Sequence, residues 1–339
     1  MNSELLAEDP FLFGLVVGIL GLLALTAVLI GGAVRLRVRN NRAQRDWNSR
    51  EQRWEPDLLG VLAGTRSDDA LHALVLPRER FFFIDFLLRY ARRLEGDERE
   101  IIERLAAPYL EPLAADLGHR GDEFRARAVR TLGLLGQRQY RDLLVAALDD
   151  PSDLVAMAAA RSLTQSGSPE LATAVLERLP RFHQWRPSLI ASMLARVGPA
   201  MAAPLRAAIE RPTGDPGSRA VAVEALTELN DLEAADPAVR LLGQATDRNL
   251  VVALLGLLLV TGRREHLGAI RPFLDSPEPS VRARAFAAVA RLDPEFSADD
   301  IRRVLADESP WVPIRVVEAL EGVGAAGLVA QINAAYHAS

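Results

Sequence analysis

The residue types that most often carry chemistry are sparse in this sequence. It has no cysteine, which excludes disulfides and thiolate metal sites. It also has no lysine, so all 40 basic residues are arginine, and Schiff-base or phosphate-loop lysines are excluded. No histidine has a second histidine or a carboxylate at a metal-ligand spacing on a shared predicted face. The five histidines are His72, His119, His183, His266 and His337. We therefore predict no metal, no cofactor and no catalytic residue.

Two other segments resemble functional motifs but lack the right context. Residues 94–100 read LEGDERE, and acids at a turn and helix start favour the helix dipole, so a solvated face is the simpler interpretation. Residues 322–327 read GVGAAG, but they follow a predicted helix, whereas a phosphate-binding glycine loop follows a strand. We identify no small-molecule substrate and predict that the protein is not an enzyme.

One segment has the residue types of a protein interface. Residues 181–186 read RFHQWR, and they crowd large side chains into a turn of a kind that elsewhere uses Asp, Ser and Pro. Tryptophan and arginine are frequent anchors of interfaces, so we predict protein binding here. The predicted contact residues are Arg181, Phe182, His183, Trp185 and Arg186. The alternative is that Phe182 and Trp185 only fill a wide groove between helix pairs.

The elements that would position this segment begin with an apolar run at 11–34. The run carries no charge, and as a helix it would span about 36 Å, enough for a hydrocarbon core of about 30 Å. A cleaved signal peptide would carry its basic residues before a shorter apolar core. We therefore predict an uncleaved single-pass transmembrane helix at 11–34, preceded by a short non-cytoplasmic tail at 1–10.

Basic residues follow the predicted span immediately. Residues 35–53 hold seven arginines against Asp46 and Glu51, whereas the charged residues of 1–10 are all acidic. The arginine-rich flank of a span stays in the cytoplasm, which predicts an external N-terminus and cytoplasmic repeats at the inner membrane. Trp47 and Trp54 are predicted anchors at the bilayer surface. The five arginines nearest the span act as a topology signal or bind anionic lipid headgroups. These membrane-proximal residues are Arg35, Arg37, Arg39, Arg42 and Arg45.

From residue 124 onward the sequence repeats every 31 or 32 residues. FRARAVRTL at 124–132 resembles VRARAFAAV at 281–289, and seven units begin at 124, 155, 186, 218, 250, 281 and 312. The fifth, sixth and ninth positions are apolar, the spacing of one buried helix face. Four residues later comes a residue that tolerates left-handed backbone, which predicts a helix, a stop and a second helix. The stop residues are Gly136, Gly167, Gly198, Asn230, Gly262, Asp293 and Gly324.

These units resemble a known family. A turn with Asp and Pro, then Val-Arg in an alanine-rich first helix, then a second helix, is similar to HEAT repeats. The unit length resembles the short bacterial HEAT-like repeats named after phycobilisome lyases. The resemblance covers 124–336 and implies an all-α solenoid. Residues 54–123 are helical but off the register, and we predict that they form an N-terminal cap.

The resemblance also implies a role for the recurring arginines. In HEAT-like folds such arginines pair with turn aspartates of adjacent repeats, and the aspartates here would be Asp150, Asp215 and Asp275. We predict this structural role for Arg125, Arg127, Arg161, Arg219, Arg282, Arg284 and Arg315.

The resemblance implies protein binding rather than catalysis. Single-span bacterial proteins with a cytosolic HEAT-like array look like accessory subunits of membrane systems, such as the glycosyltransferases that build surface polysaccharide. The region from residue 54 onward is net acidic, which disfavours nucleic acid. We predict a non-enzymatic membrane-anchored scaffold for a membrane-associated protein partner. Two alternatives stay open: a bilin-lyase-like or other HEAT-like enzyme or accessory factor, and a sensor of the lipid surface.

Overall fold

The computed structural model describes residues 26, 35, 46–293, 296 and 298–338. The predicted transmembrane helix at 11–34 lies outside these residues, apart from Thr26, which is helical and exposed. Among the described residues, no single helix has the length and apolar composition needed to cross a membrane. The segments Pro187–Ala195 and Pro199–Glu210 meet that requirement only together, as a pair bent by 113°. The membrane anchor therefore stays a prediction.

The chain divides into two compact units, Met1–Tyr109 and Leu110–Ser339. In its described part, the first unit is built from short helices with an aromatic core. These are a helix at 46–62, α3 Asp68–His72, η1 Pro77–Glu79, α4 Arg80–Ala91, α5 Gly96–Ala106 and η2 Ala107–Tyr109. Trp54 is fully buried, and its ring centroid lies 5.3 Å from that of Phe83 and 5.6 Å from that of Phe86. The prediction that Trp54 anchors at the bilayer surface is therefore wrong, because this ring belongs to the core.

A buried carboxylate holds the last two arginines of the basic segment. Glu79 is 6% exposed and forms ion pairs with Arg50, at 3.2 Å, and with Arg53. A buried carboxylate needs such partners because an unpaired charge loses its hydration without compensation. Arg50 and Arg53 therefore serve the fold of the first unit. Of the five arginines predicted nearest the membrane, the structure describes only Arg35, which is helical and exposed.

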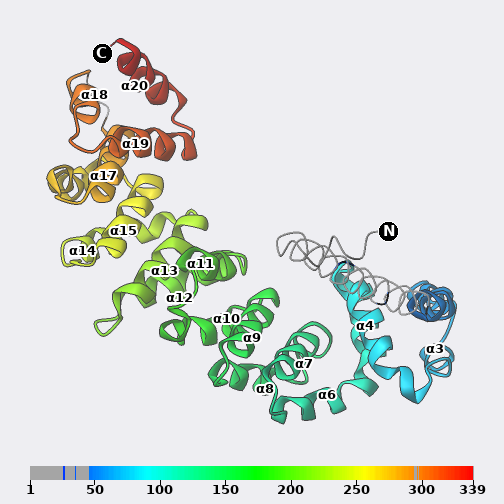
Figure 1. Ribbon diagram of the computed structural model, residues 1–339. Helices are drawn as coiled ribbons and strands as arrows, with labels where there is room; N and C mark the ends of the chain where they lie inside the picture. The colour runs from blue at the N-terminus through cyan, green and yellow to red at the C-terminus, as the bar shows by residue number, and fades with distance from the viewer. Residues whose placement is uncertain (1–25, 27–34, 36–45, 294–295, 297, 339) are drawn as a thin grey trace, which may run out of the picture. The chain divides into compact units, whose positions relative to one another are not determined.

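The second unit is a row of helix pairs, which confirms the predicted all-α solenoid (Figure 1). It begins with α6 Glu111–Ala115 and η3 Asp116–Gly118, which pack on the helix that follows, so the unit starts before the predicted residue 124. The first helices of the pairs are α7 Asp122–Leu135, α9 Asp153–Gln165, α11 Pro187–Ala195, α13 Pro216–Glu228, α15 Arg248–Thr261, α17 Pro279–Leu292 and α19 Trp311–Gly322. Each first helix contacts the next along the row.

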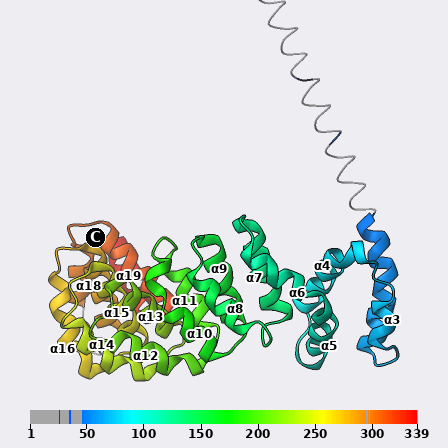
Figure 2. The same ribbon diagram turned by 90° about the horizontal axis from the view of Figure 1, so that it is seen from below.

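The second helices form another layer, and Figure 2 shows α12, α14 and α16 along one edge. They are α8 Arg141–Ala146, α10 Pro169–Leu176, α12 Ala202–Glu210, α14 Ala235–Leu242, α16 Leu267–Ile270, α18 Ala298–Leu305 and α20 Ala326–Ala338. Short 3-10 turns extend or introduce several of them: η4 Ala147–Asp149, η5 Leu179–Phe182, η6 Pro199–Met201, η7 Leu232–Ala234, η8 Arg264–His266 and η9 Arg271–Asp275. The fifth and ninth positions of every unit are buried, as Ala128 and Leu132 of α7 illustrate. This apolar stripe joins the two layers.

The predicted left-handed stops occur in four of the seven units. Backbone φ is positive at Gly167, Gly198, Asn230 and Gly324. It is negative at Gly136, Gly262 and Asp293, where the prediction is wrong. At Gly262, φ is −64°, but an added Cβ would overlap the carbonyl oxygen of Leu258 and press on Leu292. Close packing, not a left-handed backbone, therefore explains this glycine.

Candidate functional site

The predicted interface segment lies at an interruption in the row of first helices. The neighbours α9 and α11 contact each other much less than the other consecutive first helices do, and η5 stands between α10 and α11. Phe182 of η5 is 3% exposed. Trp185 lines a cavity of about 120 Å³ together with Ile190 and Ser218. Phe182 is thus packed into the joint between two units, and Trp185 borders a cavity there.

The other predicted contact residues of this segment differ in their surroundings. Arg181 donates a hydrogen bond to the backbone oxygen of Asp150 and lies 3.7 Å from a carboxylate oxygen of Asp153, so it ties the segment to the preceding unit. His183 and Arg186 are exposed. The structure therefore gives Arg181 and Phe182 structural contacts and leaves His183 and Arg186 available to a partner. Protein binding at this segment stays a prediction.

The same arginine–aspartate contact occurs in two of the units. Arg125 donates hydrogen bonds of 2.9 and 2.8 Å to Asp150, and Arg282 donates hydrogen bonds of 2.8 and 2.7 Å to Asp307. Both aspartates lie in the turn before the next first helix. Bidentate arginine–carboxylate pairs fix geometry as well as energy. The structural role predicted for Arg125 and Arg282 is therefore present.

The remaining predicted aspartates act differently. Asp215 caps α13 by accepting the backbone N–H of Ser218 at 2.8 Å, and Asp275 pairs with Arg303 of α18. Arg219 stands at the same place in its unit as Arg125 and Arg282, but the residue 25 positions later is Gln244. Within the described chain, the Nε of Arg219 is buried without a hydrogen-bond partner. The prediction that the recurring arginines pair with Asp215 and Asp275 is therefore wrong.

A groove of about 790 Å³ runs along five consecutive first helices, from α11 to α19. It is lined by Glu224 of α13, Gly256 of α15 and Arg284 of α17, among other residues. Glu224 and Arg284 are half-buried. Neither side chain has a hydrogen bond or ion pair within the part of the chain that the structure describes. The prediction that Arg284 pairs with a turn aspartate is thus wrong.

The electrostatics of this pair follow from burial in the groove. Burial, and then the charge of Glu228, raise the pKa of Glu224 above its ordinary value. Burial, and then the charge of Arg315, lower the pKa of Arg284. The charge of Arg284 lowers the pKa of Glu224, and the charge of Glu224 raises the pKa of Arg284. The two charges therefore lie close enough to interact. Partly desolvated charges without partners weaken a fold, and in a groove they mark a candidate functional site.

Gly256 forms part of the groove where packing does not require a glycine. A Cβ added at Gly256 would meet nothing closer than the Arg284 side chain at 3.9 Å, and its φ is not in the left-handed region. A glycine inside a helix costs about 0.5–1 kcal/mol relative to alanine. Gly133 of α7 differs, because a Cβ there would overlap the side chain of Ser162 on α9. Packing therefore explains Gly133 but not Gly256.

The sequence did not lead us to Glu224, Gly256 and Arg284 as a site. The columns that define the repeat face the core, whereas these residues occupy the fourth and seventh positions, on the opposite side of the first helices. Charged residues also occur at these two positions in other units, such as Arg161 and Glu318 at the seventh and Arg315 at the fourth, so these columns alone do not single out the groove.

One histidine lies among carboxylates in the second layer. Ligand atoms of Asp236, Glu265 and His266 lie within 4.8 Å of one another. His266 accepts the backbone N–H of Arg263 through Nδ1, so its Nε2 carries the proton and donates to Asp236 at 3.0 Å. The guanidinium of Arg263 already pairs with both carboxylates. We interpret the cluster as a cap for η8, in which the Arg263 guanidinium neutralises the two carboxylates.

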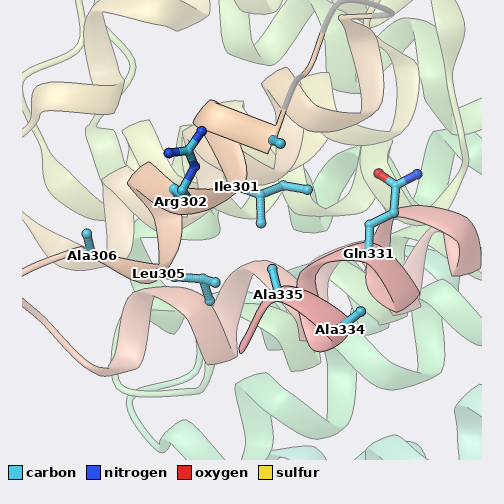
Figure 3. Close-up of a pocket in the computed structure, with 8 residues that line it drawn as sticks. Ile301, Arg302, Leu305, Ala306, Gln331, Ala334 and Ala335 are labelled. Carbon is cyan, nitrogen blue, oxygen red and sulfur yellow. The ribbon is translucent and has the colours of Figure 1, made fainter. Parts of the chain in front are cut away.

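The C-terminal helix pair carries an open apolar cleft of about 910 Å³. Figure 3 shows Ile301 and Leu305 of α18 facing Ala335 of α20, while the guanidinium of Arg302 points away from them. The last pair of a solenoid has no following pair to cover it, which explains apolar surface at this end. Among the described residues, its lining offers Arg302 and Gln331 as polar side chains and no carboxylate or histidine.

Comparisons with known proteins bear on the repeats. A family model described as HEAT repeats matches residues 110–186, which start where the second unit starts. No curated protein matches the chain in sequence. Among solved structures, the chain is similar to one described as the complex of CpcE and CpcF of phycocyanin lyase from Nostoc sp. PCC7120. The identity is 20%, the match covers 69% of this chain and 92% of that chain, and the TM-score is 0.28. Residues 110–186 are therefore similar to HEAT repeats.

Proposed function

We propose that the protein is a membrane-anchored, non-enzymatic scaffold that binds a membrane-associated protein in the groove of its first helices. The groove between α11 and α19 is the observation that carries this proposal, since Glu224 and Arg284 line it without a hydrogen bond or ion pair among the described residues. Neighbouring packed helices lie about 8–10 Å apart, so five of them span about 32–40 Å. A groove of that length suits a segment of another protein better than a small molecule.

The proposed anchor rests on the apolar run at 11–34 and the arginines after it. Confinement to the membrane surface raises the effective concentration of the solenoid against a membrane-bound partner. The net acidic solenoid favours a partner with a basic cytosolic face. Subunits of a membrane glycosyltransferase system that builds surface polysaccharide are the partner class implied by the family resemblance.

Labelling of introduced cysteines tests the anchor. Because the chain has no cysteine of its own, single cysteines at Ser3 and Ser339 can be labelled in intact cells with an impermeant thiol reagent. We expect label at position 3 and none at position 339. Label at 339 but not at 3 would reverse the proposed topology.

Co-purification with matched variants tests the scaffold. The full-length protein is purified from membranes in mild detergent, and the recovered partner is quantified for Val252→Arg, in the groove, and for Leu232→Arg, on exposed η7 in the second layer. We expect Val252→Arg to reduce partner recovery about tenfold or more, with an unchanged melting curve, and Leu232→Arg to retain it. Full recovery with a folded Val252→Arg protein would place binding elsewhere.

One observation favours an enzyme as a second candidate. The raised pKa of Glu224 lets this carboxyl keep its proton at a higher pH than an ordinary glutamate, as a general acid requires. A bilin-lyase-like protein is an enzyme class that the repeats resemble. A bilin added to the purified protein would then change its absorption spectrum with the wild type but not with Glu224→Gln. Identical spectra for both would remove this candidate.

A further inference from the structure

We infer that Glu224, Gly256 and Arg284 bind the backbone of an extended segment of the partner protein. This inference rests on the proposed function, because it specifies which chemistry the first-helix groove recognises. The three residues stand on three consecutive first helices, α13, α15 and α17, of which α15 is the middle one. All three line the same groove.

The two charged side chains require a ligand group that both donates and accepts hydrogen bonds. A guanidinium only donates and a carboxylate only accepts. A carboxylate ligand would satisfy Arg284 but would face Glu224 and Glu228, which line the same groove. A cationic ligand would satisfy Glu224 but would face Arg284. A neutral amide meets both, because its oxygen accepts from Arg284 and its N–H donates to Glu224.

The neighbouring charged groups leave this pair available. Arg315 pairs with Glu318 on its own helix at 2.8 Å, and Glu228 accepts a hydrogen bond from Ser192 at 2.6 Å. Glu224 and Arg284 have no such bond within the described residues. Hydrogen bonds to ionised groups are roughly twice as strong as those between neutral groups. An amide between the two would therefore gain more here than at an ordinary surface site.

Gly256 indicates that the amide belongs to a main chain. Glycine is typical of places where a backbone must approach a ligand closely. The groove around it is lined by small and apolar residues, including Val252, Ala253 and Val260 of α15. An extended chain rises about 3.3 Å per residue, so a groove of about 32–40 Å holds about ten to twelve residues. An extended segment offers its N–H and C=O groups along its whole length.

This assignment explains why α15 keeps a glycine that its packing does not require. Gly256→Ala should raise the melting temperature by about 1–4 °C, because alanine favours the helix, while weakening ligand binding. Gly268 of α16 provides a matched control, since a Cβ there would meet nothing within 4 Å. Gly268→Ala should raise stability in the same way and leave binding unchanged.

The test uses a displayed library of random twelve-residue peptides, panned against the full-length protein in mild detergent. A selected peptide is synthesised, and its Kd is measured by fluorescence anisotropy. We expect Arg284→Met, Glu224→Gln and Gly256→Leu each to weaken binding about tenfold or more. Gly268→Ala should change it less than about twofold. Enrichment of no peptide, or equal binding to Gly256→Leu, would overturn the inference.

Backbone methylation distinguishes main-chain from side-chain recognition. Methylating one particular peptide N–H should weaken binding to the wild type about tenfold, and the same methylation should matter little for Glu224→Gln. If no position shows this coupling, the ligand is not held by its backbone and the inference fails. The scaffold proposal fails separately, by full partner recovery with Val252→Arg.

Discussion

Arg282 and Asp307 join two consecutive helix pairs through two hydrogen bonds, of 2.8 and 2.7 Å. Both side chains are largely buried, and Arg282 also donates to the backbone oxygen of Ser276, at 2.8 Å, in the turn before its own helix. Arg125 and Asp150 form the same contact near the start of the row. One residue pair thus fixes the orientation of a unit against the next.

Loss of this arginine should weaken the solenoid. Arg282→Ala leaves Asp307 buried without its partner, so we expect the free energy of unfolding to fall by about 2–3 kcal/mol. Urea denaturation measures the change. Arg302→Ala is the control, because its ion pair with Asp299 is exposed on both sides and should contribute under about 0.5 kcal/mol. Equal losses for the two variants would contradict the structural role of Arg282.

The same contact makes stability depend on pH in a defined direction. The hydrogen bond from Arg282 lowers the pKa of Asp307 below its ordinary value in the folded state. A lowered folded pKa contributes stability above the unfolded pKa, about 3.9, and that stability is lost as pH falls through the folded pKa. The stability difference between wild type and Arg282→Ala should therefore shrink below about pH 4. Denaturation series at pH 6 and pH 3 measure it, and a constant difference would refute the coupling.

The groove residues should behave in the opposite way. Within the described chain, Glu224 and Arg284 are partly desolvated and have no hydrogen-bond partner, so replacing either by a neutral residue removes an unfavourable desolvation term. We expect Glu224→Gln and Arg284→Met to leave stability at pH 7 unchanged or to raise it by up to about 1 kcal/mol. Thermal melting of the purified variants is the measurement. A clear loss of stability would show that the pair supports the fold rather than a ligand.

Two glycines of the stop column should respond differently to asparagine. Gly167 has φ of +72°, close to that of Asn230 in an equivalent position, so Gly167→Asn should change stability by less than about 1 kcal/mol. Gly262 has negative φ and no room for a Cβ, so Gly262→Asn should cost about 1–3 kcal/mol. Urea midpoints of both variants decide this, and similar losses would show that one cause governs the whole column.

The periodic features of the fold could be predicted from the sequence. Ala128, Leu132 and their equivalents recur at fixed spacing and are buried in every unit, because the packing of each pair repeats. The pairing of Arg125 with Asp150 was predictable only through the resemblance to HEAT repeats. The column of stops was only partly predictable, because glycine serves both a left-handed backbone and close packing, and its identity alone does not tell which.

The non-periodic features escaped prediction. Trp54 was predicted to anchor at the bilayer surface because it lies close in sequence to the predicted span. Its burial depends instead on contacts with Phe83 and Phe86, which follow later in the chain. Glu224 and Arg284 lie on helices separated by another helix, so their proximity depends on the geometry of three stacked units. No local pattern in the sequence contains that geometry.

Photo-crosslinking in cells tests most directly whether the first-helix groove holds the partner. A photo-crosslinking amino acid is placed in the full-length protein at Val252, in the groove, or at Leu232, exposed in the second layer. We predict a crosslinked adduct with one membrane protein from position 252, its loss when Gly256→Leu is added, and no adduct from position 232. An adduct from position 232 with none from position 252 would contradict the proposed binding groove.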